Sequence, residues 1–386
     1  MVDEPTSADA SILNERLLAA VRVLDGRTYA VVDGAQFEDL PHDLAMAGLN
    51  YRSLYLGAPD PGLLRASPFL IDPYLAPPPN VEGFETNETE LADRLRGAGH
   101  DPDALTEEGI ALSATFVSEQ FTAWVAEQEA RPAPDPMAQF AKLFDLVGDC
   151  PAMVLWSGRM EAAELFKHLR SLNRAIAPMD EEDIERDEDG QPVGPVVKPY
   201  LFRHYDGRVV AEFLPVLDRE QFRRFFGPAS RLTFLAPGYE NDAGDPLRMA
   251  ELPDELRAVP MPSGMLRLTQ DQIAAVEERK LRSMWRGFMN EILPRAPQTE
   301  TPFSDEELSA MAWNAMLVAR DYGVESEEAF EAFVLMELIS RGAATRSERL
   351  RKTMQADDPS FGTPDERILK FKERFDARIR RDFGGQ

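Results

Sequence analysis

Two kinds of hydrophobic periodicity divide this chain, and they constrain its fold more than any other feature. Up to about residue 245, short apolar runs typical of buried strands alternate with segments whose apolar residues recur at helical spacing. From residue 264 onward only the helical spacing remains. Alternation of this kind is typical of a sheet covered by helices. The sequence therefore predicts an α/β fold, with an N-terminal lobe built on a mixed sheet covered by helices and an all-helical C-terminal lobe.

The strands expected in the first lobe are short and rich in β-branched and aromatic residues. They cover residues 28–32, 52–56, 69–71, 152–156, 200–205 and 231–236, the last closing the series. Pro68 and Pro73 enclose the third run, which favours an edge strand or an extended segment there. Helices are expected near residues 13–24, 37–44, 162–172 and 218–226, and Asp218 with Gln221 forms a capping-box pattern at the start of the last.

In the second lobe, capping residues precede four helical patterns. Thr269, Ser304, Ser326 and Thr363 are the expected N-caps, and Gly323 is expected just past the end of the second helix. We therefore expect an α/β domain over residues 1–245 and a helical lobe over residues 264–386. Within the first domain, residues 76–136 interrupt the pattern and are interpreted as a partly ordered insertion.

A second interruption, residues 178–195, is an acidic loop. Its segment 180–189 (DEEDIERDED) holds eight carboxylates and one arginine. The run lacks the alternating order and the closing glutamate of a calcium loop, so a solvated loop is the better interpretation.

Charge and composition narrow the function classes. The 68 acidic and 42 basic side chains give a formal net charge of −26, which disfavours binding to nucleic acid or to an anionic membrane surface. Residues 341–386 are the exception, because they hold 12 basic and 8 acidic side chains. One cysteine allows no internal disulfide, the start resembles no signal peptide, and no apolar run is long enough to span a membrane. These features predict a cytoplasmic protein.

Motifs for catalysis and for metal or cofactor binding are missing. Ser157 follows a strand, but Leu155 stands where a nucleophile elbow needs glycine. A nucleophile pair of Cys150 and His168 is conceivable, although no sequence feature orients either partner. The four histidines are scattered, without metal-ligand spacing. We expect no enzyme activity, no catalytic residue, no metal and no cofactor.

The densest polar cluster beside an expected strand is residues 203–208 (RHYDGR). In a strand, Arg203 and Tyr205 would share one face, opposite Phe202 and His204. We interpret Arg203 as a partly buried cation paired with Asp206 or Asp33, which would fix how strand and helix meet. Direct contact with a partner protein is the alternative that stays open.

Several segments occur together in a familiar order: residues 29–35 (YAVVDGA), 53–57 (SLYLG), 201–208 (LFRHYDGR), 214–217 (LPVL) and 225–228 (FFGP). Residues 268–272 and 319–326 add to the set. The chain resembles the bacterial type VI secretion effector adaptors, the family named domain of unknown function 4123. The resemblance implies a chaperone that holds a toxic effector in the cytoplasm and loads it onto the VgrG spike. It also implies that Arg203, Tyr205, Asp206 and Arg208 are signature positions for partner binding or for folding.

Two other functions stay open. An immunity-like inhibitor could use its acidity to mimic nucleic acid and block a toxin, and a hydrolase could use Ser157 or Cys150. A toxin complex held by charge would dissociate in salt, whereas an adaptor complex held by apolar contacts would be less sensitive to salt.

Overall fold

The chain divides into two compact units, Met1–Leu268 and Thr269–Gln386. The structure is a computed structural model that describes residues 7–22, 26–55, 60–77, 88–98, 117, 119–120, 132–147, 150–179, 184–187, 189–240, 244–292, 303–356 and 359–383. Residues 246–263, which belong to neither expected domain, lie in the first unit. Most of the expected insertion 76–136 lies outside the described residues, although helix α4 (Glu88–Gly97) falls within it.

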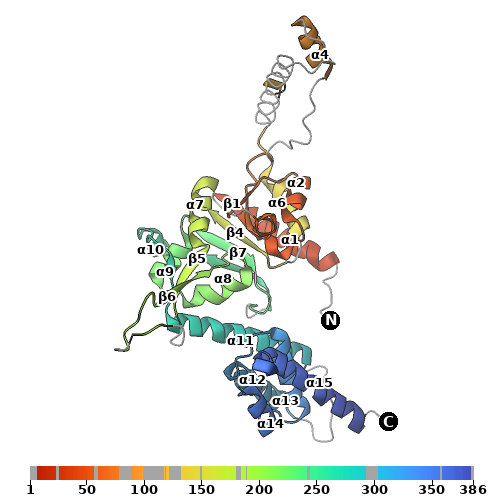
Figure 1. The fold of residues 1–386 in the computed structure, drawn as a ribbon. Coiled ribbons are helices and arrows are strands. Elements are labelled where there is room, and N and C mark those ends of the chain that lie inside the picture. Colours follow the sequence, from red (N-terminus) through yellow and green to blue (C-terminus); the bar gives the residue numbers. More distant parts are fainter. Residues whose placement is uncertain are drawn as a thin grey trace. The chain divides into compact units, whose positions relative to one another are not determined.

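Two sheets form the framework of the first unit (Figure 1). The large sheet has the order β2-β3-β1-β4-β7-β8, and every pairing in it is antiparallel. Its strands are β1 (Arg27–Asp33), β2 (Tyr51–Ser53), β3 (Pro68–Ile71), β4 (Met153–Gly158), β7 (Arg231–Leu235) and β8 (Leu247–Glu251). The small sheet has the order β6-β5-β9 and is mixed, with strands β5 (Arg174–Pro178), β6 (Val197–Leu201) and β9 (Leu266–Arg267).

Helices cover both faces of the large sheet. On one face Ala30, Val32 and Leu155 pack in a buried cluster with Leu17 and Phe140, which come from α1 (Ser7–Arg22) and α6 (Pro136–Val147). Trp156, the neighbour of Leu155, faces the other way because side chains alternate along a strand. Strand β1 is buried on both faces, so its apolar residues form a continuous run.

The remaining helical segments of this unit are short. They are η1 (Gly34–Gln36), α2 (Leu40–Met46), α3 (Pro61–Arg65), α7 (Ala162–Leu172), α8 (Gly207–Phe213), η4 (Leu214–Val216), α9 (Arg219–Phe226) and α10 (Asp254–Arg257). The predicted capping box at the start of α9 is confirmed, since the Asp218 side chain accepts from the Gln221 amide and the Gln221 side chain from the Asp218 amide.

Three strand predictions need correction. The run 200–205 is not one strand, because β6 ends at Leu201 and the chain turns before α8. Strand β3 lies between β2 and β1 and is not an edge, since Pro68 is its first residue and removes no interior hydrogen bond. Strand β7 does not close the series either, because β8 pairs with it at its other edge.

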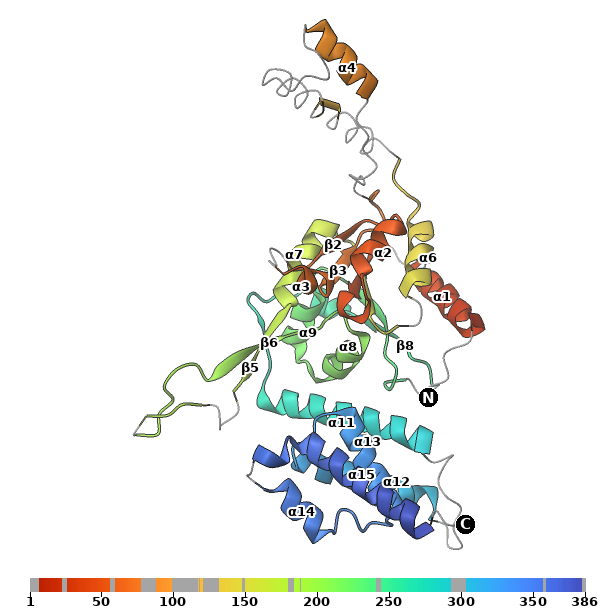
Figure 2. The same ribbon diagram turned by 45° about the vertical axis from the view of Figure 1, so that its right-hand side comes forward.

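The second unit is helical (Figure 2). Its elements are α11 (Gln270–Ile292), α12 (Asp305–Asp321), α13 (Glu327–Ile339), α14 (Glu348–Met354), η6 (Pro359–Phe361) and α15 (Pro364–Phe383). The predicted caps are confirmed at Thr269, Ser304, Ser326 and Thr363, and Gly323 follows α12 with a φ of 77°. Helix α14 lacks a predicted counterpart.

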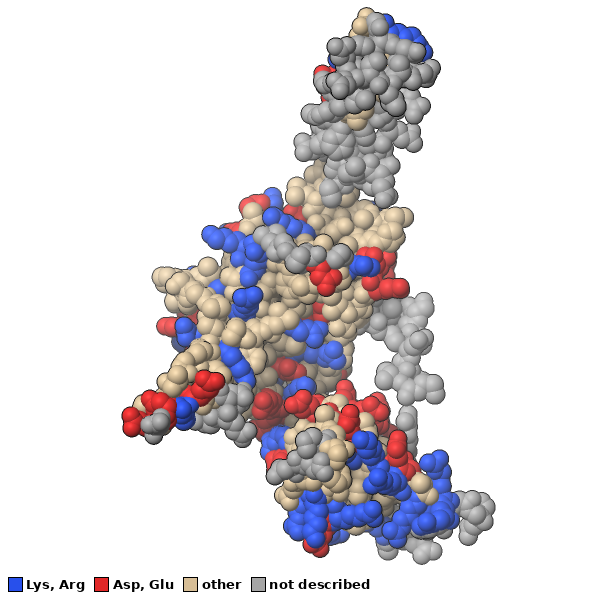
Figure 3. All heavy atoms as spheres, viewed as in Figure 1, with Lys and Arg blue, Asp and Glu red and all other residues tan. Residues whose placement is uncertain are grey.

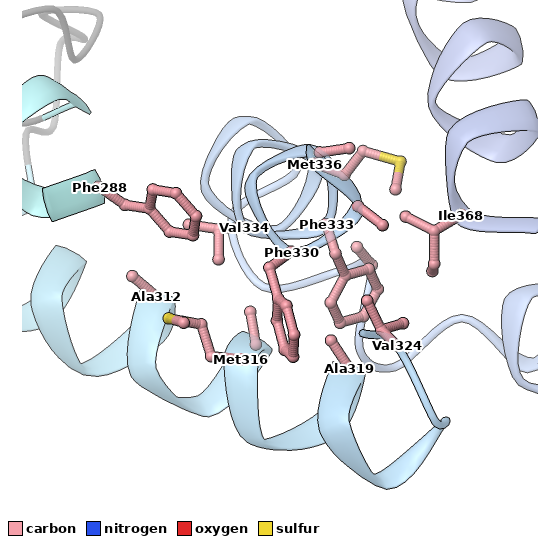
Figure 4. Close-up of a cluster of buried hydrophobic side chains, with 14 of the residues drawn as sticks. Phe288, Ala312, Met316, Ala319, Val324, Phe330, Phe333, Val334, Met336 and Ile368 are labelled. Carbon is pink, nitrogen blue, oxygen red and sulfur yellow. The ribbon is translucent and has the colours of Figure 1, made fainter. Parts of the chain in front are cut away.

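The core of this unit is apolar. Phe330, Phe333 and Val334 of α13 pack between Met316 of α12 and Ile368 of α15 (Figure 4). Burial of such large side chains is the main force that holds short amphipathic helices together.

Candidate functional site

An ion-pair network joins the end of β1 to the start of α8. Arg203 Nη2 donates to Asp33 Oδ2 at 2.5 Å and lies 3.4 Å from Asp206 Oδ2. Both carboxylates are buried, with side chains 2% and 7% exposed, whereas the Arg203 side chain is 38% exposed. The expected ion pair is therefore confirmed, and Arg203 meets both of its proposed partners. We call Asp33, Arg203 and Asp206 the arginine network.

Both carboxylates of the arginine network also hold a backbone turn. Asp33 Oδ1 accepts from the Ala35 amide at the start of η1, and Asp206 Oδ1 accepts from the Arg208 amide at the N-terminus of α8. Burial alone would lower the pKa of the Arg203 guanidinium, but the hydrogen bond and charge of Asp33, together with the charge of Asp206, help to raise that pKa. The guanidinium therefore stays charged, and it fixes two turns against each other.

Glycine 207 allows α8 to begin where it does. A Cβ atom at this position would lie 2.0 Å from the Leu235 carbonyl oxygen of β7, which no side chain can tolerate. The Gly207 amide donates to the Pro151 carbonyl oxygen at 3.1 Å, just before β4. The first turn of α8 is thus pressed against the large sheet, and this contact places Asp206 beside Arg203.

The other two predicted residues differ in exposure. Tyr205 is buried, its hydroxyl oxygen lies 3.4 Å from that of Tyr55, and burial raises the pKa of the Tyr205 phenol. Arg208 is half exposed, and its Nε lies 3.9 Å from Asp206 Oδ1. The four residues are therefore brought together by a turn and the start of a helix. Arg203 and Tyr205 lie in that turn and not on one face of a strand, as the sequence suggested. Arg203 and Arg208 present the accessible polar atoms.

A second polar cluster, which we call the imidazole cluster, lies on the Trp156 face of the large sheet. His168 Nε2 lies 2.9 Å from the Phe225 carbonyl oxygen, and Arg224 Nη1 lies 3.2 Å from His168 Nδ1. His204 Nε2 lies 3.0 Å from Asn173 Oδ1. Both imidazole rings meet the Trp156 ring edge-on.

Burial keeps both imidazoles neutral. It lowers the pKa of His168 to about 4, with the positive charges of Arg224 and Arg223 acting in the same direction. It lowers the pKa of His204 to about 3, with help from His168. Sequence analysis missed this cluster because its members are far apart in the chain and share no spacing. The one local signal was the pair Phe225 and Phe226 before Gly227, which indicates the buried end of a helix.

The residues of the hydrolase alternative are Ser157 and the pair of Cys150 and His168. Ser157 is buried in β4, and its hydroxyl oxygen lies 2.9 Å from that of Thr28. Cys150 packs against the cluster that contains Leu155, whereas His168 contacts Trp156 on the opposite face of the sheet. The proposed nucleophile pair is therefore separated by the large sheet.

Over the described ranges, no group of three or more histidine, cysteine, aspartate or glutamate side chains could hold a metal ion. In the same part of the chain, no helix is both long and apolar enough to cross a membrane.

The hairpin of β5 and β6, which we call the arm (Figures 1 and 2), exposes several apolar side chains. The register pairs Ile176 with Pro199 and Pro178 with Val197, so these side chains share one face with Leu201 and with its partner Arg174. Leu201 is 61% exposed and Val197 is 37% exposed. We call the five apolar side chains of this face the arm face, and the charged Arg174 adjoins them at Leu201.

The connection between the two strands is acidic. Glu185, Asp187 and Asp189 are exposed there, and Figure 3 shows red side chains gathered at the end of an otherwise mostly tan arm. The acidic loop expected over 178–195 is thus the tip of this hairpin where it is described, with a bridge between Arg186 and Pro192.

Strand β6 is an edge of the small sheet. The Phe202 amide donates to the Asn173 carbonyl, and the Met179 amide donates to the Val196 carbonyl. Since antiparallel pairs alternate, Val197, Pro199 and Leu201 direct their backbone groups away from β5. Proline has no amide hydrogen, so Pro199 presents only a carbonyl oxygen to that edge.

Comparison with known proteins gives one match. The family described as "Domain of unknown function (DUF4123)" matches residues 28–224, a little more than half of the chain. The chain belongs to this family. No curated protein and no solved structure matches the sequence.

The DUF4123 match spans the arginine network, the arm and both buried histidines, and it ends within α9. The helical unit from Thr269 onward lies outside the matched residues. The match thus covers most of the first unit and none of the second unit.

Proposed function

We propose that this DUF4123 protein is a cytoplasmic adaptor that binds a type VI secretion effector and loads it onto the VgrG spike. Its resemblance to effector adaptors suggests this role, and the exposed arm face is the observation that carries it. Apolar patches left open on a soluble domain mark sites of protein binding more often than scattered apolar residues do.

The arm face suits an apolar segment of the effector. Five apolar side chains from two strands form a continuous surface, and the edge of β6 beside it offers backbone carbonyls to an extended chain. The acidic tip adds a preference for a segment flanked by basic residues. In this proposal the apolar face supplies the affinity for the effector segment, and the charged tip supplies the selectivity.

The arginine network has a supporting role in this proposal. Its two carboxylates are buried and committed to Arg203 and to backbone amides, so they hold the fold of the first unit. Arg203 and Arg208, the exposed members of the predicted set, are left as secondary contacts for effector or spike. The proposal assigns no catalytic residue and no cofactor.

Co-purification tests the proposal. The tagged chain is co-expressed with a type VI secretion effector and with VgrG from the same bacterium, and the captured proteins are quantified. Wild type should retain both, and Leu201→Asp combined with Val197→Asp should reduce effector capture at least about tenfold, because two charges interrupt the apolar face. Met249→Asp is the matched control, since Met249 is 63% exposed on the edge strand β8 of the same unit.

The outcomes separate the surface from the function. Failure of the wild type to capture either protein would contradict the adaptor role. Capture that survives in the arm variant would remove the arm face and leave the adaptor role standing. A complex that dissociates when salt is raised would favour the acidic inhibitor, because contacts between exposed charges are screened whereas apolar contacts are not.

A further inference from the structure

A cavity of about 490 Å³ opens beside the end of β4, where α9 and α10 lie side by side (Figure 1). Three arginines, Arg159, Arg223 and Arg257, contribute to its lining. The other lining residues are uncharged: Gly227, Pro228, Ala229, Ser230 and Leu252. Such a concentration of positive charge is unexpected in a chain whose formal net charge is −26.

Two of these guanidinium groups are held in place by backbone carbonyls. Arg223 donates through Nε to Val259 at 3.1 Å and through Nη1 to Gly227. Arg257 donates through Nε to Leu252 at 3.2 Å. A guanidinium has five N–H donors, so among the described contacts each group keeps donors for a further acceptor in a fixed orientation.

The positive charge of Arg223 is not compensated by a carboxylate in the described contacts. Burial lowers the pKa of its guanidinium, and no acidic group opposes this effect. Arg257 has one acidic neighbour, since its Nη1 lies 3.3 Å from Asp254 Oδ1. The Asp254 side chain is 92% exposed, so water screens most of its charge.

We propose that this cavity, which we call the arginine pocket, binds the oxyanion group of a small ligand, either a carboxylate or a phosphate. Planar guanidinium groups match the oxygen spacing of both anions and bind them through paired hydrogen bonds. The site does not depend on the adaptor role, because it lies apart from the arm face in sequence and uses other residues.

Calorimetric titration of the full chain with inorganic phosphate and, separately, with succinate tests the proposal at low ionic strength. Wild type should show saturable binding of one or both anions at millimolar concentration. Binding of phosphate alone identifies a phosphate ligand, and binding of succinate alone identifies a carboxylate ligand. Saturable binding of neither anion would overturn the proposal.

Variants of two charged residues give effects of opposite sign. Arg257→Gln should weaken binding about fivefold, and Asp254→Asn should strengthen it about twofold, because one removes and the other unmasks positive charge at the mouth of the cavity. Arg65→Gln, which removes an exposed arginine at the end of α3, is the control for net charge and should leave affinity unchanged.

Equal weakening by Arg65→Gln and Arg257→Gln would show nonspecific attraction and would overturn the site. Unchanged affinity in Arg257→Gln would do the same. Thermal unfolding of each variant checks that the fold is retained, and Arg159→Gln serves as the second pocket variant if Arg257→Gln unfolds.

Discussion

The interiors of the two units are stabilised by different kinds of side chain. The first unit buries charged and titratable groups, among them Asp33, Arg224 and two histidines, and it pairs Asp33 with Arg203 and Arg224 with His168. The second unit relies on large apolar side chains, and within its described residues Glu337 is the one buried charged group. Interior volume should therefore control the stability of the second unit, and charge and protonation that of the first.

The hydrogen bonds of the buried Glu337 carboxylate are local in sequence. Its oxygens accept from the Thr345 amide at 2.9 Å and from the Thr345 hydroxyl at 2.7 Å, eight residues further along the chain. It closes the turn after α13, whereas Asp33 and Arg203 are 170 residues apart and connect distant parts of the first unit.

The largest expected effect is the loss of volume in the second unit. Phe333→Ala should lower the free energy of unfolding of this unit by about 3–5 kcal/mol, because Phe333 is fully buried between three helices. Hydrogen exchange measured by mass spectrometry reports the two units separately. Phe333→Leu, which keeps most of the volume, should cost about 1 kcal/mol. An equally large loss in both variants would contradict a core held by volume.

The next effect is acid sensitivity confined to the first unit. Unperturbed histidine titrates near pH 6.5, whereas the pKa of His168 is about 4 and that of His204 about 3 in the fold. The unfolded chain therefore binds more protons as pH falls below 6.5, and stability decreases in that direction. From pH 7 to about pH 5 the loss should be about 2 kcal/mol for each imidazole.

The second unit contains no histidine and serves as the internal control. Peptides of the first unit should exchange faster at the lower pH after correction for the intrinsic exchange rate, and those of the second unit should not. Parallel destabilisation of both units would rule out the imidazole cluster as the cause.

A smaller effect is expected from the arginine network. Asp33→Asn keeps the shape of the side chain but removes the charge that faces Arg203, so the free energy of unfolding of the first unit should fall by about 2 kcal/mol. Glu251→Gln removes the partner of Arg231 in an exposed pair and should cost at most about 0.5 kcal/mol. Denaturant unfolding of both variants gives the two free energies of unfolding. Similar losses would mean that the buried ion pair of Asp33 stabilises the unit no more than the exposed pair of Glu251.

The smallest effect on stability is expected at the arm face. Leu201→Ser should change the free energy of unfolding by less than about 0.5 kcal/mol, because most of the Leu201 side chain is in water. The same substitution should weaken effector capture in the co-purification assay. A large loss of stability would show that Leu201 belongs to the core and is not available for binding.

Sequence alone predicted the elements whose local signals are strong. The buried runs of β1 and β4 and the capped helices α9, α12 and α15 were found because periodicity and caps act within a few residues. Strands β5 and β8 were missed, since RAIAP contains little β-branched character and LRMAE is partly exposed on an edge. Helix α8 was missed because its aromatic lead-in resembles a strand, although Asp206 followed by Gly207 is a helix-start signal.

The candidate sites divide in the same way. The pairing of Arg203 with Asp33 and Asp206 could be expected, because a lone arginine at a strand end needs a carboxylate. The arginine pocket and the arm face could not, since each depends on the register or packing of segments that are distant in the chain. Interactions of that kind follow from tertiary structure and leave no spacing in the sequence.

Pro199 has a consequence for how this protein behaves at high concentration. A strand edge with an apolar face invites the same strand of another copy, and repeated addition of such strands leads to insoluble aggregates. The missing amide hydrogen leaves a gap in any hydrogen-bond ladder that two β6 strands would build, while the acidic tips of two copies would repel each other. If the arm face binds an effector segment as proposed, Pro199 and the acidic tip would oppose pairing of two copies while leaving that face accessible.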